Sequence, residues 1–517
     1  MLHANDYDGN YPADAVRLAA LFPSATRTGA GEVVVTSCTT DWREVEPGDV
    51  FVALPDCLGP DGGREGSGED GHIHAQRAVS HGAIAVVCEQ PVPVFDVPTY
   101  LVPDSRIALG EICQALVGHP TQSLGVIGVT GTHGKSTTIA LLESIFSVAG
   151  KHCGKLSSLG CYDGMTHSAG VSDVPSAPAL ASRLARMAAA GCSHALVEVS
   201  SQALSQYRFA GMEFDAVCVT NVTDAHLDQH NTVQSYRETK RRILDYVSVT
   251  GVTVLNADDP VSLKWLDRVT GPVLTFGLSR PSGNTAAEIT ATVIDCLANE
   301  QTFVLTAGSD SVAVRTTIIG EQHVANCLAA ATLSLSYGIE LQTIAAGLEA
   351  VTKIPARMEP VDCGQGFPVF IDAAASPESL RVSLRTARQL ANRRVICVWG
   401  ESAGGTGSEH LAISQVLKSM ADLAIVTQPL PTQAIGSPAT DGGPWPSHRM
   451  NVEVVADRNE AIACAVAIAE PGDVVVIAGS RVAPGFVFGA AEQPISDSEI
   501  ARQLLCAREE PTFRSVA

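Results

Sequence analysis

Residues 126–146 read VIGVTGTHGKSTTIALLESIF, an apolar run that leads into a glycine-rich segment and then into a helical pattern. This order predicts a strand, a loop over residues 131–136 and a helix. Backbone N–H groups of such a loop bind phosphate together with the helix N terminus, Lys135 adds positive charge, and the Ser136 hydroxyl can coordinate Mg²⁺. Val129 stands where the strict eight-residue motif has glycine, so the loop is a shortened G-T-x-G-K-S variant. The alternative is a glycine-rich turn that binds nothing.

Apolar runs of four to eight residues alternate with helical patterns on both sides of this segment, which predicts an α/β protein with mostly parallel sheets. A chain of 517 residues is long enough for about three domains. We expect an N-terminal domain over residues 1–120, a central domain over 121–353, and a C-terminal domain over 354–517. The last has the βαβαβ order of a small Rossmann-like domain.

Composition excludes several classes of protein. The net charge is −21 and no run of Lys or Arg stands out, so neither nucleic acid nor an anionic membrane is an expected partner. The fourteen cysteines include no C-x-x-C pair, which argues against a zinc or dithiol site. With no long apolar stretch and no signal-like start, the sequence predicts a cytoplasmic protein without membrane insertion.

Further polar residues follow strand-like runs in the central region. Glu198 ends the strand-like run HALVEVS, where a carboxylate can complete a Mg²⁺ shell or can cap the next helix. His226 and His230 stand four apart in the segment TDAHLDQHN, but without the glutamate of a zinc protease motif. Lys240 lies in a helical pattern rich in Arg and Glu, and periodicity alone makes it an ordinary solvated lysine.

Taken in order, these segments resemble the Mur ligase family of peptidoglycan synthesis over nearly the whole chain. The likeness is strongest to the MurE type, which adds the third residue of the peptide stem. Its motifs are GTHGKS, EVSS, TNVTDAHLD, YRETK and LNADD in the central region, with DWREVEPGDVFVAL, DGH and HGAIAVVCE before them. The resemblance implies three α/β domains that bind a UDP-sugar, ATP and an amino acid.

The resemblance also implies roles for individual residues. Lys135, Glu198, His226 and Lys240 would be catalytic; Ser136, Glu198, His226 and a carbamylated Lys240 would hold Mg²⁺. The nucleotide would contact Gly131, Thr132, His133, Gly134, Lys135, Ser136, Thr137, His323, Arg357 and Asp372. The UDP-muramoyl-peptide would contact Arg43, Asp70, His72, Ser172, Asp173 and Ser200. We expect a monomer that uses ATP and Mg²⁺.

The sequence departs from the family pattern mainly in polar groups. His323 replaces the asparagine that faces adenine, and Ser172-Asp173-Val174-Pro175 replaces a Thr-Thr-Pro segment. In the C-terminal region, Asp372-Ala373-Ala374-Ala375-Ser376-Pro377 lacks the tyrosine and histidine of D-Y-A-H-T-P, and Gln428-Pro429-Leu430-Pro431 replaces D-N-P-R. The apolar strands around these changes are intact, so we expect a folded protein with an altered amino-acid side.

Two functions follow from this pattern. The first is an ATP-dependent ligase that forms an amide bond between a UDP-N-acetylmuramoyl-peptide and an amino acid or other amine, through an acyl phosphate. The second is a catalytically weak paralogue that binds nucleotide for regulation or scaffolding. Folylpolyglutamate synthesis shares the ATP chemistry, but that family lacks a separate UDP domain in front of the phosphate loop.

Overall fold

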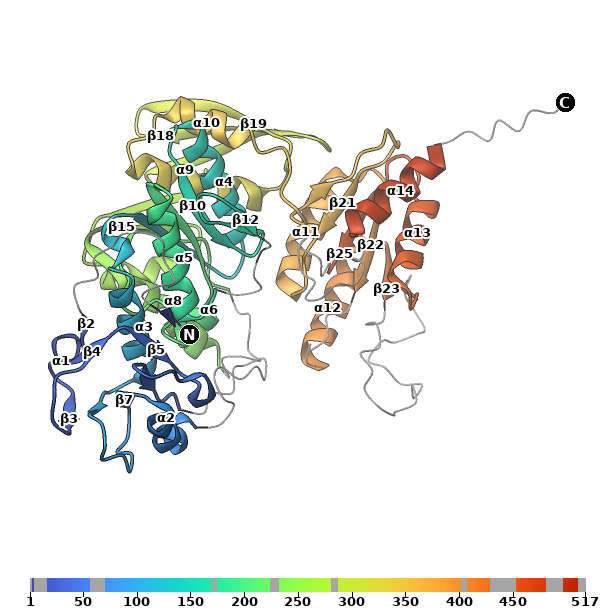
Figure 1. Cartoon of the computed structure of the whole chain (residues 1–517). Coiled ribbons are helices and arrows are strands. Elements are labelled where there is room, and N and C mark those ends of the chain that lie inside the picture. The colour runs from blue at the N-terminus through green and yellow to red at the C-terminus, as the bar shows by residue number, and fades with distance from the viewer. Residues whose placement is uncertain are drawn as a thin grey trace. The chain divides into compact units, whose positions relative to one another are not determined.

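The computed structural model describes residues 2–3, 16–55, 70–168, 170, 174–223, 232–279, 287–400, 407–427, 452–479 and 496–509. The chain divides into two compact units, residues 1–275 and 276–517, and each is described by itself. Figure 1 shows the elements of both units. Within the described residues, no helix is both long and apolar enough to cross a membrane.

The first unit begins with a six-stranded sheet in the order β1-β5-β6-β7-β8-β3. Strands β5 to β8 run parallel, while β1 and β3 pair antiparallel at the two edges. Its elements are β1 (Leu2–His3), β3 (Thr26–Thr28), β5 (Ser37–Thr39), β6 (Val50–Val52), β7 (Ala85–Cys88), β8 (Thr99–Leu101), α2 (Ala75–His81) and α3 (Ser105–Leu116). Short elements beside it are β2 (Val16–Arg17), α1 (Leu18–Leu21), β4 (Val34–Val35), η1 (Trp42–Glu44), η2 (Gly71–His74) and η3 (Pro120–Gln122). All residues of β6 and β7 are buried, as continuous apolar runs in parallel strands predict.

The rest of the first unit is built on strands in the order β12-β11-β10-β13-β9-β14-β15. The four strands β10, β13, β9 and β14 are parallel neighbours, so β9 lies inside the sheet. The strands are β9 (Gly125–Thr130), β10 (Cys153–Ser157), β11 (Gly160–Tyr162), β12 (His167–Ser168), β13 (His194–Val199), β14 (Phe214–Val219) and β15 (Val247–Asn256). The helices are α4 (Lys135–Val148), α5 (Ala177–Ala189), α6 (Ser201–Ser205), α8 (Val233–Arg241), η4 (Arg242–Tyr246) and η5 (Ser262–Arg268).

The second unit starts within β16 (Val273–Leu278) and continues with an antiparallel meander of β17, β18 and β19. Its first elements are β17 (Ile289–Cys296), β18 (Gln301–Ala307), β19 (Asp310–Thr316), α9 (Glu321–Ser336) and α10 (Leu341–Glu349). Most residues of α9 are buried, including Thr332 and Ser334, whose hydroxyls donate to the carbonyls four residues earlier. This helix is therefore an internal element, as its nearly continuous apolar and small residues predict.

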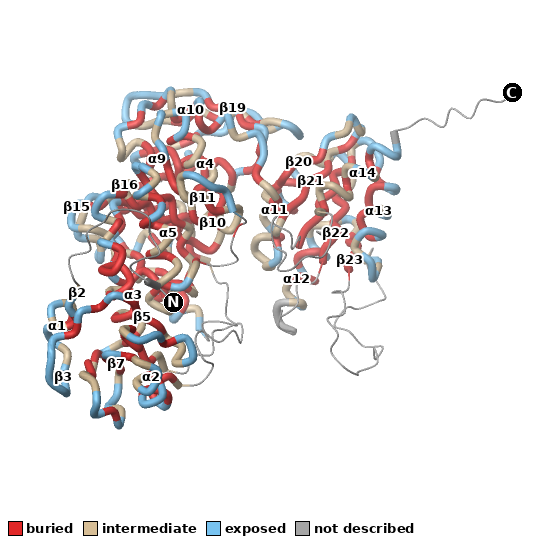
Figure 2. The backbone as a smooth tube through the Cα atoms, viewed as in Figure 1, coloured by how far each residue is buried: buried red, intermediate tan, exposed pale blue. Residues whose placement is uncertain are grey.

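A six-stranded sheet in the order β20-β21-β25-β22-β23-β24 closes the second unit. All its pairs are parallel except β20 with β21. The strands are β20 (Glu359–Pro360), β21 (Val369–Asp372), β22 (Val395–Gly400), β23 (Leu423–Thr427), β24 (Val452–Val454) and β25 (Val474–Ala478); the helices are α11 (Pro377–Leu390), α12 (Gly407–Met420), α13 (Arg458–Ile468) and α14 (Asp497–Glu509). Helices α11 and α12 cover one face and α13 and α14 the other (Figure 1), and the strands β21, β25, β22 and β23 between them are almost fully buried (Figure 2). The doubly wound arrangement predicted for this region is confirmed.

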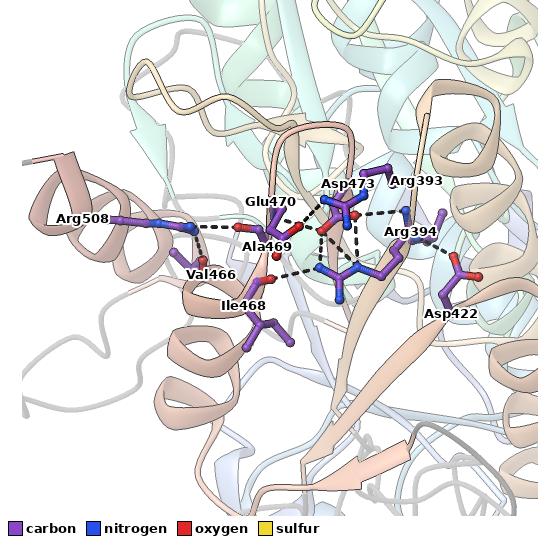
Figure 3. A network of polar contacts seen from close by, with 10 residues as sticks. Arg393, Arg394, Asp422, Val466, Ile468, Ala469, Glu470, Asp473 and Arg508 are labelled. Carbon is purple, nitrogen blue, oxygen red and sulfur yellow. Dashed lines mark hydrogen bonds and ion pairs between the residues drawn. The ribbon is translucent and has the colours of Figure 1, made fainter.

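An ion-pair network ties the amino ends of three adjacent strands in this sheet (Figure 3). Asp473, just before β25, is fully buried and accepts hydrogen bonds from the Arg394 side chain at 2.6 and 3.2 Å and from the Glu470 N–H at 2.9 Å. Asp422, just before β23, accepts from the Val395 N–H at 2.7 Å. Burial by itself raises the pKa of Asp473, but the Arg394 guanidinium and the N–H donors outweigh it and lower that pKa.

Candidate functional site

The loop after β9 has the backbone of a phosphate-binding loop. Gly131 has φ +154° and Gly134 has φ +86°, conformations that glycine adopts readily and other residues rarely. Gly134 is the N-cap of α4 and no side chain caps this helix. Because the first-turn N–H groups of a helix have no intrahelical partners, this end of α4 suits an anion. The predicted strand, loop and helix over residues 126–146 are confirmed.

Glu198 lies at the centre of the polar groups around this loop. Its carboxylate accepts from Ser136 Oγ at 2.9 Å, from Ser157 Oγ at 2.9 Å, and from the N–H and Oγ of Ser158 at 2.9 and 3.1 Å. Burial alone raises the pKa of this carboxyl, yet the Lys135 charge and these hydrogen bonds outweigh burial and lower the pKa. Glu198 is therefore an ionised carboxylate at neutral pH and does not cap α6, whose N-cap is Ser200.

Two lysines share one carbonyl oxygen beside Glu198. Lys135 Nζ donates to Gly131 O at 3.0 Å, and Lys240 Nζ donates to the same oxygen at 2.8 Å. Lys240 is 2% exposed, and its Nζ lies 5.0 Å from the centre of the Tyr236 ring. Burial first and the Lys135 charge second lower the pKa of Lys240 well below its usual value. The solvated lysine that periodicity suggests is therefore wrong; Lys240 points into the protein at the phosphate loop.

The structure adds residues that the sequence prediction missed. Ser157 and Ser158, at the end of β10, contact Glu198, while Thr220 and Asn221, just after β14, contact the loop itself. The signal was available, because all four directly follow or end strands that neighbour the β9–β13 pair, and carboxyl ends of parallel strands meet at one edge.

The substrate candidates Arg43, Asp70, His72 and Ser200 have partners within the first unit. Asp70 accepts from the His72 N–H at 3.0 Å and from His72 Nδ1 at 2.6 Å, and His72 Nε2 accepts from the Glu89 N–H at 3.0 Å. Arg43 Nε donates to Asp41 at 2.9 Å, and Ser200 Oγ accepts from the Ala203 N–H at 2.9 Å. Both ring nitrogens of His72 are thus engaged within the domain, and the substrate contacts of these residues stay predictions.

Three further nucleotide candidates belong to the second unit. His323 is 5% exposed, and burial lowers its pKa to about 4. Its Nε2 lies 3.4 Å from Cys327 Sγ, and its Nδ1 has no hydrogen-bond partner among the described residues. Asp372 accepts from the Met358 N–H at 2.8 Å, and burial raises its pKa although the Arg357 charge opposes this. Arg357 donates to Ala356 O at 2.9 Å. Their contacts with a nucleotide stay predictions.

Some predicted site residues fall outside the described part of the chain. These are His226, Ser172 and Asp173, together with the segment 428–431. Thr137 is described and buried in the first turn of α4. Across the described residues, no group of three or more His, Cys, Asp or Glu side chains is arranged to hold a metal ion. Ser136 and Glu198 supply only oxygen donors, which fits Mg²⁺ held jointly with substrate phosphates.

Comparison with known proteins assigns the chain to a family. Residues 129–334 match the Mur ligase middle domain, and residues 356–481 match the Mur ligase glutamate ligase domain. The chain is 35% identical over 480 residues to a UDP-N-acetylmuramoyl-L-alanyl-D-glutamate–2,6-diaminopimelate ligase of Geobacillus kaustophilus, covering 91% of this chain and 95% of the relative. It is 32% identical over 492 residues to a UDP-N-acetylmuramyl-tripeptide synthetase of Roseiflexus, covering 90% and 93%.

Solved structures show the same fold. A UDP-N-acetylmuramoyl-L-alanyl-D-glutamate–2,6-diaminopimelate ligase superposes with a TM-score of 0.68 at 23% identity, covering 96% of this chain and all of that one. A MurF ligase from Thermotoga maritima in complex with ADP gives 0.57 at 18%, covering 91% and 97%. The chain therefore belongs to the Mur ligase family, whose members include these enzymes. It is an ATP-dependent ligase of the MurE-like kind, and the α/β fold and family predicted from sequence are confirmed. The domain boundaries at 120/121 and 353/354 stay predictions.

Proposed function

We propose that the protein joins an amino acid to UDP-N-acetylmuramoyl-L-alanyl-D-glutamate in peptidoglycan precursor synthesis. A carboxylate oxygen of the peptide attacks the γ-phosphorus of ATP, so that ADP leaves and an acyl phosphate forms. The amine nitrogen of the amino acid then attacks the acyl carbon, phosphate leaves, and the nitrogen loses a proton. An amide, ADP and phosphate are the products.

The hydrogen bonds that three serines near the loop donate to the Glu198 carboxylate support the ATP-dependent step of this proposal. The N–H groups of Gly134 to Ser136 and the Lys135 ammonium would face the phosphates, where charge builds up during transfer. Ser136 and Glu198 would hold Mg²⁺, with His226 and a carbamylated Lys240 near a second ion. Mg²⁺ would neutralise phosphate charge. Carbamylation needs a neutral amine, and the lowered pKa of the buried Lys240 supports that.

The remaining substrates are assigned to the other domains. The N-terminal sheet would bind the UDP-sugar through residues such as Arg43, and the sheet of β20 to β25 would bind the amino acid. Diaminopimelate, the amine in the name of the Geobacillus relative, is the first to test. Residues 428–431 read QPLP in place of D-N-P-R, the motif that contacts diaminopimelate in the MurE type, so other amines are tested beside it. We further propose a cytoplasmic monomer.

One experiment tests this function. Purified protein is incubated with ATP, Mg²⁺ and UDP-N-acetylmuramoyl-L-alanyl-D-glutamate, and ADP release is measured with diaminopimelate, lysine and a pool of other amines. We expect acceptor-dependent ADP and a nucleotide peptide heavier by one amino acid residue, both lost in Lys135→Ala. ADP binding without acceptor-dependent turnover for any amine would instead support the second candidate, a catalytically weak paralogue. That candidate is motivated by residues 372–377, which lack the tyrosine and histidine of the family motif.

A further inference from the structure

The phosphate loop forms several hydrogen bonds with one residue that follows a different strand, β14. Asn221, just after β14, accepts a hydrogen bond from the His133 N–H at 2.9 Å and donates its own amide N–H to His133 O at 3.1 Å. Its backbone carbonyl accepts from the Thr132 N–H at 2.9 Å. Three hydrogen bonds therefore connect Asn221 to two consecutive loop residues.

These contacts divide the loop into two functional parts. The N–H groups of Thr132 and His133 are directed to Asn221, so in this conformation they are engaged inside the protein. Phosphate is then left to the N–H groups at the start of α4, from Gly134 to Ser136, and to Lys135. The direction of those groups depends on the peptide planes before them, which Asn221 fixes.

The position requires the chemistry of an asparagine. The His133 backbone offers its N–H as a donor and its C=O as an acceptor, and a side-chain amide carries both complementary groups, an oxygen acceptor and an N–H donor. Thr220 reinforces this by donating its hydroxyl to His133 O at 2.6 Å. Asn256, the last residue of β15, in turn donates to Thr220 O at 2.7 Å, so β15 also helps to position Thr220.

We propose that Asn221 is a positioning residue for ATP, one that sets the geometry of the phosphate loop without touching the nucleotide. This inference rests on the proposed function, because it needs ATP to bind at the loop. Asn221→Ala removes both side-chain hydrogen bonds. Asn221→Asp keeps the acceptor for the His133 N–H but places a carboxylate oxygen against His133 O, and adds negative charge near the phosphates.

The KM for ATP and the kcat together distinguish a positioning role of Asn221 from a loss of folded protein. With the other substrates saturating, we expect Asn221→Ala to raise the KM for ATP about tenfold, the loss expected for about two hydrogen bonds, and Asn221→Asp to raise it further. A variant that merely unfolds in part contains fewer active molecules, which lowers the apparent kcat and leaves KM unchanged. If Asn221→Ala does not fold, Asn221→Ser, which keeps one acceptor, takes its place.

Gln365→Ala is the matched control. The Gln365 amide also bonds loop backbone twice, accepting from the Cys363 N–H at 2.8 Å and donating to Val361 O at 2.8 Å, but in the second unit. We expect this variant to lower stability and leave the KM for ATP as in the unsubstituted protein. The inference is overturned if the KM of the Asn221 variants stays within twofold, or if Gln365→Ala raises it equally. Failure of the proposed function would look different, because the unsubstituted protein would then release no acceptor-dependent ADP.

Discussion

Substituting Gly131 by alanine tests whether the phosphate loop is as tightly fitted as the structure shows. A Cβ at this position would lie 1.9 Å from Thr220 Oγ1 and 3.2 Å from the Asn221 backbone. Contacts below 3.0 Å force movement, and overpacking of this kind costs about 1–3 kcal/mol. The φ of +154° adds about 1 kcal/mol or more for a residue with a side chain. We therefore expect Gly131→Ala to reduce the free energy of unfolding by about 3 kcal/mol.

The assay combines thermal unfolding with nucleotide binding. A loss of about 3 kcal/mol lowers the melting temperature of a unit of this size by roughly 6–10 °C, and the displaced loop should weaken ADP binding measured by calorimetry. Gly150→Ala is the matched control, because Gly150 has φ +72° with nothing within 4 Å of an added Cβ, so it reports the backbone cost of about 1 kcal/mol alone. Adding Thr220→Ala to Gly131→Ala removes the clashing oxygen and should recover part of the stability. Equal melting temperatures for the Gly131 and Gly150 variants would refute the reasoning.

Three other changes have defined outcomes. Glu198→Gln keeps the shape of the side chain but removes its charge, so we expect acceptor-dependent ADP release to fall at least about 100-fold with a higher Mg²⁺ requirement; turnover within threefold of the unsubstituted protein would contradict this. Asp473→Asn should cost about 2 kcal/mol at pH 7 in urea unfolding. Because the folded pKa of Asp473 is lowered, this stabilisation is present above the unfolded pKa near 3.9 and is lost as pH falls through the folded pKa, so the difference should shrink below about pH 4; a constant difference would argue against it. His323→Asn places a donor and an acceptor side by side on one amide, whereas the imidazole carries them on separate ring nitrogens; the ratio of kcat/KM for ATP over GTP should therefore rise, and an unchanged ratio would show that His323 does not contact the base.

The sequence predicted the elements well where apolar runs and glycines determine them. The strand, loop and helix over residues 126–146 and the doubly wound order after residue 367 both follow from period and turn chemistry. Pairwise contacts between distant segments were less predictable. Glu198 could equally be a helix cap from its position in the sequence alone. Lys240 is predicted as a surface residue because local periodicity does not report that α8 contacts the loop after β9 through Tyr236 and Lys240.

The support of the loop was the hardest part to predict. Asn221 and Ser158 contact residues 88 and 40 positions away in the chain, and their role depends on the order of β10, β13, β9 and β14 in the sheet. That order is set by crossovers, which residue patterns do not encode. Residues at the ends of neighbouring parallel strands are therefore the ones to examine first in such a fold.

The position of the Asp473 network has an evolutionary consequence. Arg394, Asp422 and Asp473 join the amino ends of β22, β23 and β25, while ligands of doubly wound sheets bind at the opposite, carboxyl ends. Stability and recognition thus depend on separate ends of the same strands. Substitutions such as those in Asp372–Pro377 can then accumulate at the recognition end while the sheet stays folded, which leaves the domain able to acquire a different substrate preference.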